Sequence, residues 1–366
     1  MFSGAPSHLI SPLLKLSLSS QSNRFLHRHI AMQALKFEKT GSLDNLSLVN
    51  IDKPTLRPGE ALIRVRAAGV NGSDTAGVMG ILPFVTTPRI PGRDFSGEVV
   101  EVLEESGASS QQWIGAEVWG TGGNRGFSSD GTFSQYVVVP IDALSRKPAT
   151  LDHSKAGSMT LPWLCAWITV DTLANVKEGD NVIIIGARGG IGSAAAQLCK
   201  ERGARVFGTY TSLAKVTPPS YITPIELSSK GAIREAIAKA GLQNRIDVLL
   251  DCAGYDQPFN DAVFTMTPEG TGRVVIMAVH TKDGLFPVDL RTFYTKALTL
   301  KGMKSGILGP LEVKKVLDEL ASKIDSGLLE GPKEVKEVNI TNMDAVKGAL
   351  QEILTRASHV RSVIIP

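Results

Sequence analysis

Apolar and polar residues alternate along the first part of the chain after residue 32, a pattern typical of short β-strands with one buried face. Clusters of Gly, Ser and Pro separate these stretches and predict long loops, of which 120–132, GTGGNRGFSSDGT, is an example. The alternating stretches are MQALKFEKT, LSLVNIDKP, EALIRVRAAGV, FSGEVVEVL, AEVWG and TFSQYVVVP. Residues 33–155 are therefore expected to form a strand-rich domain.

From about residue 156 the pattern changes to fully apolar strands that alternate with helices. The predicted strands are NVIIIG, ARVFGTY, IDVLLDCAG, GRVVIMAV and ALTLKGM. This alternation predicts an α/β fold with a doubly wound parallel sheet over 156–306. The preceding stretch, KAGSMTLPWLCAWITVDTLANV, predicts helix, and Pro162 is expected to begin a second helix because proline fits the first turn of a helix better than its interior.

The C-terminal segment, 307–366, contains two amphipathic helices and a closing strand, RSVIIP. Gly327 is expected to end the first helix and Asn342 to cap the second. The apolar stripe of the first helix is Val313, Val316, Leu317, Leu320 and Ile324, and that of the second is Val346, Leu350, Ile353 and Leu354.

The first 37 residues contain no Asp or Glu, but seven serines and four Lys or Arg. This composition predicts a mitochondrial transit peptide over residues 1–32 and a mitochondrial location. The alternatives are a disordered extension or a start upstream of Met32, with a cytoplasmic protein.

Composition excludes several classes of function. The 39 basic and 36 acidic residues give a net charge of +3, too balanced for the basic field that nucleic-acid binding needs. No apolar run reaches the ~18–20 residues of a membrane span. The three cysteines lie far apart, so neither a disulfide framework nor a structural zinc site is indicated.

The strongest functional signal is the stretch NVIIIGARGGIGSAAAQLCKERG, in which glycines lie between a buried strand and a helix. Glycines in this context let the backbone approach a pyrophosphate, which the helix N-terminus also attracts. Ala253 and Gly254, after a later strand, are expected to line the same groove because ligands bind at the carboxyl ends of such strands. The predicted binding residues in the turn are Gly186, Gly189, Gly190, Ile191 and Gly192.

The end of the second strand favours NADP(H) over NAD(H). An NAD enzyme of this kind has a carboxylate there for the ribose 2′-hydroxyl, whereas the next acid in this chain is Glu226, beyond a proline-rich turn. Hydroxyl groups and an ammonium group suit a 2′-phosphate instead. The predicted contacts are Tyr210, Thr211, Ser212 and Lys215.

The order of GVNGSD, PGRDFSGEVVEV, LPWLCAW, GARGGIG and DVLLDCAG resembles the medium-chain dehydrogenase/reductase superfamily over residues 33–366. Within it, the chain is similar to the zinc-free quinone oxidoreductase branch. The resemblance implies an alcohol dehydrogenase-like catalytic domain over 33–155, a Rossmann domain over 156–306 and a C-terminal segment, 307–366, that returns to the catalytic domain. Relatives commonly form homodimers through an edge strand of the parallel sheet, so a homodimer is expected.

The resemblance also implies that no metal is bound. Zinc members carry Cys where Asn71 stands and His where Arg93 stands, and they have a four-cysteine lobe that this chain lacks. A catalytic zinc needs about three protein ligands, so Cys165 alone does not hold one. His153 and His280 have no partner at ligand spacing and are expected to be surface or structural residues.

Asn71 and Asp74 are the candidate catalytic residues. In relatives the Asn faces the nicotinamide and the substrate, and an amide can donate to a developing oxyanion. The alternative is that Asn71 only shapes a turn, and Gly72, in place of the usual proline, leaves the geometry of this loop open. Ser73 and Asp74 are expected to cap the helix that starts there. Arg93 and Asp94 are expected to pair with each other or with neighbours.

Without zinc, no metal stabilises the negative charge that forms on the substrate when hydride is added. A conjugated substrate can spread that charge onto its own oxygen, so the expected lack of zinc favours such a substrate. The expected function is zinc-independent, NADPH-dependent hydride transfer to a small molecule, either a quinone or an α,β-unsaturated carbonyl. One alternative is an enoyl-thioester reductase of fatty-acid or polyketide synthesis, although DTAGVMGILPF lacks the tyrosine that the mitochondrial enzymes of this type carry. The other is a binding module that keeps the dinucleotide without catalysis.

Overall fold

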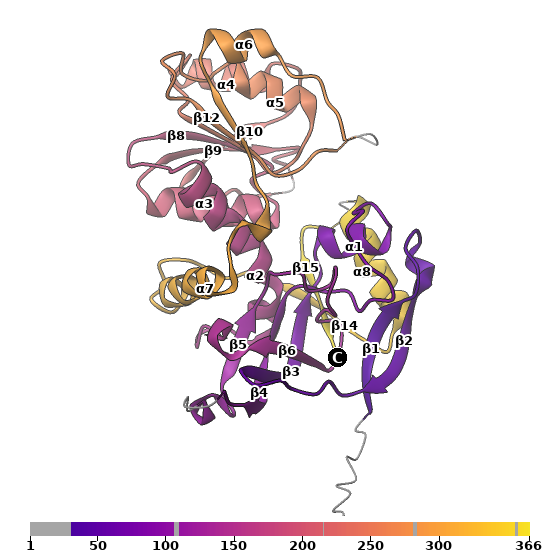
Figure 1. Cartoon of the computed structure of the whole chain (residues 1–366). Helices are drawn as coiled ribbons and strands as arrows, with labels where there is room; N and C mark the ends of the chain where they lie inside the picture. Colours follow the sequence, from indigo (N-terminus) through magenta and orange to yellow (C-terminus); the bar gives the residue numbers. More distant parts are fainter. Residues whose placement is uncertain (1–30, 106–109, 215, 281–283, 356–357) are drawn as a thin grey trace, which may run out of the picture.

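The computed structural model describes residues 31–105, 110–214, 216–280, 284–355 and 358–366 (Figure 1). The predicted transit peptide lies outside this part of the chain except for Ala31 and Met32, which begin the first strand. That strand therefore starts two residues before the predicted domain boundary at 33. Among the described residues, no helix is long and apolar enough to cross a membrane.

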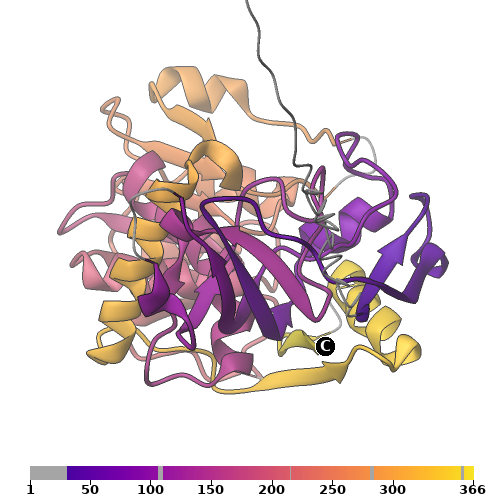
Figure 2. The same cartoon turned by 60° about the horizontal axis from the view of Figure 1, so that its bottom comes forward.

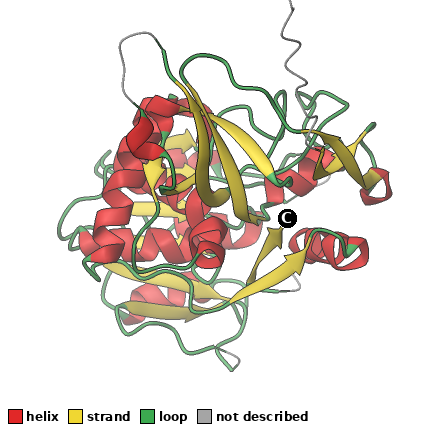
Figure 3. Ribbon diagram, turned by 90° about the horizontal axis from the view of Figure 1, so that it is seen from below, coloured by secondary structure: helices red, strands yellow, loops and turns green. Residues whose placement is uncertain are grey.

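The N-terminal domain is built around a seven-stranded sheet in which β3 (Glu60–Gly69) is central. Its order is β14-β15-β3-β4-β5-β7, and β6 pairs with β3 outside this path. The C-terminal segment thus contributes two strands, which Figure 3 shows close to the chain end. The other strands are β4 (Phe95–Leu103), β5 (Glu117–Gly120), β6 (Tyr136–Pro140), β7 (Ser145–Arg146), β14 (Val335–Asn339) and β15 (Arg361–Ile365).

A separate antiparallel pair, β1 (Ala31–Phe37) and β2 (Leu46–Asp52), lies beside helix α8 (Met343–Thr355), as Figures 1 and 2 show. Helix α8 also packs against α1 (Gly72–Val78). Short helical turns complete the domain at η1 (Leu43–Asn45), η2 (Gln111–Trp113) and η3 (Ile141–Ala143).

The second domain is a parallel sheet of six strands in the order β10-β9-β8-β11-β12-β13, which confirms the predicted doubly wound fold. One core, with α2, α3 and α7, covers one face, and another, with α4, α5 and α6, covers the opposite face. The strands are β8 (Asn181–Ile185), β9 (Arg205–Tyr210), β10 (Ile222–Glu226), β11 (Val248–Asp251), β12 (Arg273–Ile276) and β13 (Thr299–Gly302). The helices are α3 (Gly190–Glu201), α4 (Ala232–Lys239), α5 (Asp256–Val263), α6 (Leu290–Thr295) and α7 (Pro310–Asp325), with η5 (Ser305–Ile307) before α7.

Three strands were not predicted from the sequence: β10, β14 and the two-residue β7. Strand β10 contains Pro224, which weakens its strand pattern, but a proline is tolerated because β10 forms the edge of the sheet. Strand β14 is mostly polar, VKEVN, and buries only Val338. Strands β10 and β14 are held by one parallel neighbour each, β9 and β15, a long-range pairing that local patterns do not reveal.

The prediction for Pro162 is wrong. Helix α2 (His153–Trp167) runs through it without interruption and continues into the π-helical segment η4 (Ile168–Leu173). Proline has no N–H to donate to the carbonyl four residues earlier, which belongs to Ser158. That carbonyl instead accepts a hydrogen bond from Arg361 Nε at 2.9 Å, so a side chain from β15 stabilises the interrupted helix.

The predicted amphipathic helices are present. All five stripe residues of α7 are buried, and Asn342 Oδ1 accepts from the Ala345 N–H at 3.1 Å, as expected for a residue that caps α8. Helix α7 packs in the same core as α2 and α3, and it also contacts η3 and strand β7 of the N-terminal sheet.

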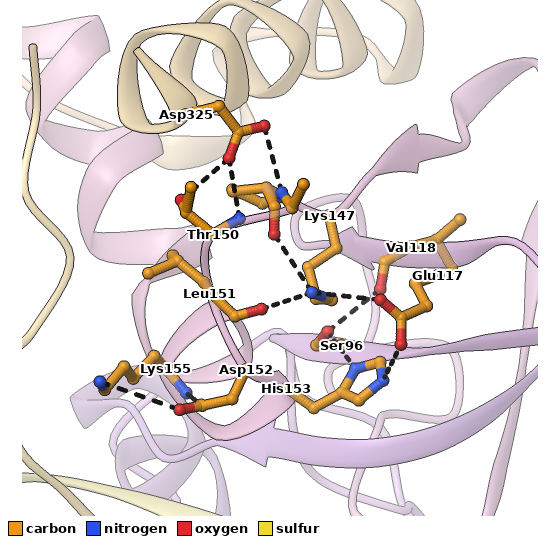
Figure 4. Close-up of polar contacts among 12 residues, drawn as sticks. Ser96, Glu117, Val118, Lys147, Thr150, Leu151, Asp152, His153, Lys155 and Asp325 are labelled. Carbon is orange, nitrogen blue, oxygen red and sulfur yellow. Dashed lines mark hydrogen bonds and ion pairs between the residues drawn. The ribbon is translucent and has the colours of Figure 1, made fainter. Parts of the chain in front are cut away.

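The start of α2 is joined to the N-terminal sheet by a polar network (Figure 4). The imidazole of His153 lies between Ser96 Oγ, 2.8 Å from Nδ1, and Glu117 Oε1, 3.1 Å from Nε2. Lys147 Nζ lies 3.2 Å from the second oxygen of Glu117. His153 is therefore a structural residue, and this network fixes the helix against the sheet.

Candidate functional site

The glycine turn between β8 and α3 has the geometry of an anion cradle. Gly186 has a φ of +81°, which favours glycine, and its N–H donates to Thr209 Oγ1 at 3.0 Å. A Cβ on Gly192 would lie 2.2 Å from the Gly186 carbonyl oxygen, so only glycine fits there. The turn leads directly into α3, whose first N–H groups have no helical acceptor and can bind a phosphate.

A cavity of about 560 Å³ opens beside this turn. It lies between the carboxyl ends of the parallel strands and a wall formed by the end of α8 and the start of β15. Most of the predicted cofactor residues line it: Gly186, Gly189, Gly190, Ile191, Gly192, Tyr210, Thr211, Ser212 and Ala253.

Two predicted residues stand apart from this wall. Gly254 does not line the cavity; its φ of +77° and its contact with Ala278, whose carbonyl oxygen would be 2.5 Å from a Cβ, give it a backbone role. The Asp251 carboxylate accepts from the N–H groups of Ala253 and Gly254 at 2.9 Å each, which fixes the turn after β11. Lys215 lies outside the described residues.

Sequence reasoning missed the cations of the cavity. Arg188 stands inside the GARGGIG loop and could have been noted from its position, whereas His359 and Arg361 come from the other end of the chain. Burial lowers the pKa of His359, and the charge of Arg188 lowers it further. Burial raises the pKa of Tyr210, an effect that Arg188 opposes. The charge of Arg188 thus acts on both Tyr210 and His359, and all three side chains line the cavity.

Arg361 joins this cavity to the predicted catalytic loop. Its Nη2 donates to Asn71 Oδ1 at 2.8 Å and to the Val70 carbonyl at 3.2 Å. A Cβ on Gly190 would lie 3.3 Å from its Nη1, so its charge also adds to the positive end of α3, where it could face a pyrophosphate. Burial lowers the pKa of Arg361, and the nearby carboxyl groups oppose that shift.

Asn71 is only 4% exposed and lies behind Val70 and Arg361 rather than in the cavity wall. Its Nδ2 donates to Asp94 Oδ2 at 3.0 Å and has a longer contact of 3.4 Å with the Gly69 carbonyl. Asn71 is also the residue that caps α1. Its carboxamide therefore bridges Arg361 and Asp94.

Asp74 has the expected capping role, and Ser73 does not. Asp74 Oδ2 accepts from the Asn71 N–H at 2.8 Å, whereas Ser73 Oγ is buried without a hydrogen-bond partner. Burial raises the pKa of Asp74 to about 7, and repulsion from Asp94 adds to the shift. Asp74 does not reach the cavity.

Arg93 and Asp94 bond to neighbours rather than to each other. Arg93 donates to Ser305 Oγ at 3.1 Å, and Asp94 Oδ1 accepts from the Leu161 N–H at 3.0 Å. Burial raises the pKa of Asp94, and its hydrogen bonds oppose the shift. The turn of α2 around Pro162 thus binds two charged side chains, Arg361 at the Ser158 carbonyl and Asp94 at the Leu161 N–H.

The donor set does not suit a metal. Among the described residues, no three His, Cys, Asp or Glu side chains converge to hold an ion. Cys165 is buried, and burial raises its pKa to about 12, which opposes the thiolate form that zinc requires. His280 stacks on Tyr255, with ring centroids 5.2 Å apart.

Comparison with known proteins agrees with this architecture. Residues 57–149 match the alcohol dehydrogenase GroES-like domain, and residues 190–322 match the zinc-binding dehydrogenase domain. A zinc-type alcohol dehydrogenase-like protein of Schizosaccharomyces pombe is 28% identical over 85% of this chain and 90% of its own length. A quinone oxidoreductase of Sus scrofa is 25% identical over 82% of this chain and 87% of its own length.

Solved structures show the same fold. One is an alcohol dehydrogenase superfamily protein from Novosphingobium aromaticivorans, with a TM-score of 0.76 and 25% identity. The match covers 92% of this chain and 99% of that protein. Both domains and their order along the chain agree with these two domain families. The chain belongs to the medium-chain dehydrogenase/reductase superfamily and is an oxidoreductase of a family that uses NAD(P)H.

Proposed function

We propose that the protein is a zinc-independent, NADPH-dependent reductase that transfers hydride to a quinone or an α,β-unsaturated carbonyl compound. One observation carries the proposal: Arg361 in the wall of the dinucleotide cavity is hydrogen-bonded to Asn71 behind it, and Asn71 to Asp94, and this cluster offers no set of metal ligands among the described residues. The quinone oxidoreductase of Sus scrofa, 25% identical over most of both chains, supports the substrate class.

The cluster suits a reaction in which the substrate itself spreads the charge. When bound, NADPH supplies a hydride to the β-carbon, the alkene electrons move onto the carbonyl oxygen as an enolate, and the α-carbon takes a proton from solvent. One hydride, which carries two electrons, and one proton thus reduce one C=C bond. Arg361, which lines the cavity, is our candidate donor to the enolate oxygen. Asn71, whose Oδ1 accepts from Arg361 Nη2 at 2.8 Å, is our candidate positioning residue for that guanidinium.

The phosphorylated cofactor is favoured by the charge beyond β9. The hydroxyl groups of Thr211 and Ser212 line the cavity there together with Arg188, which supplies the positive charge. His359 also lines the cavity and, with its lowered pKa, supplies a neutral ring N–H. Glu226 is turned to the Leu213 N–H, 2.9 Å from its Oε1. A 2′-phosphate would therefore meet donors and positive charge.

Two other functions make different predictions. An enoyl-thioester reductase has some support from the fold of the CurK enoyl reductase, with a TM-score of 0.74 at 22% identity, a level that speaks for the fold alone. A module that binds dinucleotide without catalysis is the second. A spectrophotometric screen of NADPH oxidation with naphthoquinones, simple enones and crotonyl-CoA separates the three: turnover of the first two classes supports the proposal, preference for crotonyl-CoA supports the thioester reductase, and cofactor binding without turnover supports the module.

We also propose a homodimer formed through β13, the edge strand of the parallel sheet, whose residues are all exposed. Leu290 and Tyr294 of α6, shortly before β13 in sequence, are also exposed apolar side chains.

Finally, we propose that residues 1–32 direct the protein to mitochondria. Imaging of a C-terminally tagged chain tests this, and a signal confined to the cytosol would contradict it.

A further inference from the structure

Two arginines next to the catalytic cluster carry more positive charge than their surroundings balance. Arg93 is 3% exposed, and its Nε is buried without a hydrogen-bond partner. Its two Nη atoms donate to Ser305 Oγ at 3.1 Å and, weakly, to the Gly123 carbonyl at 3.5 Å. Neither acceptor is charged, so the guanidinium has polar contacts but no anionic partner among the described residues.

Arg125 is the second cation, and it lies on the loop 120–132. It is half-buried, and no described residue gives it a hydrogen bond or an ion pair. The guanidinium lies over the ring of Phe95, whose centroid is 5.5 Å from the guanidinium carbon. Arg93 contacts the same loop through the Gly123 carbonyl, two residues before Arg125. Burial lowers the pKa of Arg125 to about 10, the charge of Arg93 lowers it further, and Asp94 opposes the shift.

The carboxyl groups nearby are already engaged. Asp94 accepts from Asn71 and from the Leu161 N–H, and Asp74 accepts from the Asn71 N–H. Burial raises the pKa of both carboxyl groups, which reduces the negative charge that they offer. Ring contacts with Phe95 and Phe127 offset only part of the free energy needed to hold two cations away from water.

The arginine pair lies between the hydrogen-bonded cluster beside the cofactor cavity and the solvent-exposed part of the loop 120–132, where a substrate could bind. The hydrogen-bonded chain Arg361–Asn71–Asp94 leads from the cofactor cavity to Arg93, the next residue in sequence. The half-buried Arg125 and the exposed residues before it in the loop give access from solvent. A guanidinium presents N–H groups in a fork that matches a carboxylate or a phosphate group.

We propose that Arg93 and Arg125 form the recognition site for an anionic group of the substrate, a carboxylate or a phosphate. The substrate is then an acidic conjugated carbonyl compound rather than a neutral quinone or enone. This inference rests on the proposed function for the reaction, but the binding of the anion can be measured without turnover.

The test compares charged and neutral members of two probe pairs on the full chain with NADP⁺ present, by isothermal titration calorimetry. The carboxylate pair is trans-4-oxo-2-pentenoate and its methyl ester. The phosphate pair is crotonyl-CoA and the crotonyl thioester of N-acetylcysteamine. The variants are Arg125→Gln and Arg125→Lys. Arg205→Gln is the matched control, because this exposed arginine also lies over an aromatic ring, that of Phe207. Arg205 is at the start of β9, whereas the cofactor cavity lies at the end of that strand.

We expect the wild-type protein to bind the charged member of one pair about tenfold more tightly than the neutral member. Arg125→Gln should remove that preference and leave the neutral probe unchanged, Arg125→Lys should keep part of it, and Arg205→Gln should have no effect. Which pair shows the preference tells whether the anion is a carboxylate or a phosphate.

Equal binding of charged and neutral probes by the wild-type protein overturns the proposal. An equal loss of both probes in Arg125→Gln overturns it as well, because it would show a structural role. Charge-selective binding without NADPH oxidation by any probe would instead contradict the proposed function and leave the anion site standing.

Discussion

Arg361 Nε donates to the Ser158 carbonyl at 2.9 Å, across 203 residues of sequence. This is the carbonyl that Pro162, inside α2, leaves without its helical donor. The same guanidinium donates to Asn71, so one side chain from β15 stabilises both helix α2 and the predicted catalytic loop at Asn71.

Replacing Arg361 should therefore destabilise the fold, and a change at Pro162 should repair part of the loss. Arg361→Gln is expected to lower the free energy of unfolding by about 2–4 kcal/mol, because buried acceptors lose a charged donor. In a Pro162→Ala background the loss should be smaller, since an alanine N–H can donate to Ser158. Urea unfolding of the two single variants and the double variant measures this coupling, and strictly additive losses would contradict it.

The buried carboxyl group of Asp74 should make stability depend on pH. Its pKa is about 7 in the folded protein, against about 3.9 in the unfolded chain. The folded state binds the proton more tightly, so this group's contribution to stability is lost as the pH rises from about 4 to about 7.

Asp74→Asn removes the titration and keeps an acceptor for the Asn71 N–H. Its free energy of unfolding relative to wild type is expected to rise by ~1–4 kcal/mol from about pH 5 to about pH 8. Chemical unfolding at both pH values measures the change. The exposed Asp142→Asn serves as control, and an equal shift in both variants would show that Asp74 is not its source.

Gly192→Ala should abolish dinucleotide binding. Its Cβ would lie 2.2 Å from the Gly186 carbonyl oxygen, so the cradle must deform. We expect the dissociation constant for NADP⁺ to rise by about a hundredfold or more, equivalent to ~3 kcal/mol. Gly348→Ala is the control, since a Cβ there meets nothing within 4 Å on α8. Fluorescence titration with NADPH measures both, and unchanged affinity in Gly192→Ala would exclude this turn as the binding site.

The cations beyond β9 should select the phosphorylated cofactor. Arg188→Ala and Lys215→Ala are each expected to raise the Michaelis constant for NADPH by about tenfold, the effect of losing one charge-assisted hydrogen bond of ~1.4 kcal/mol. The constant for NADH should hardly change. Lys200→Ala, whose Nζ lies over the Tyr221 ring, controls for loss of charge elsewhere. Steady-state kinetics with both cofactors decide, and parallel increases for NADPH and NADH would argue against a 2′-phosphate site.

The edge strand should control assembly. Leu300 on β13 is 44% exposed, and a glutamate there would place two negative charges close together across a symmetric strand pair. Leu300→Glu is therefore expected to yield monomers in light scattering coupled to size-exclusion chromatography. Leu311→Glu on α7 is the control, because Leu311 is 53% exposed and lies away from this edge, so its replacement should leave assembly unchanged. A wild-type monomer would contradict the proposed dimer.

Local patterns in the sequence predicted the parts of the cofactor site that are continuous in the chain. The glycines from Gly186 to Gly192, and Tyr210 to Ser212 after β9, follow directly from strand, turn and helix signals within about 30 residues. Such signals are reliable because backbone geometry and amphipathic burial depend on near neighbours.

Long-range packing decided the remainder. His359 and Arg361 close the cavity from the other end of the chain, and no periodic pattern links them to Gly190 or Ser158. Pro162 was predicted to begin a helix because its own sequence cannot show that an arginine from β15 supplies the missing donor. The sequence by itself determined the two domains and the glycine turn. Only the tertiary structure decided which distant charges meet beside them, because the free energy of a buried charge depends on partners that folding brings together.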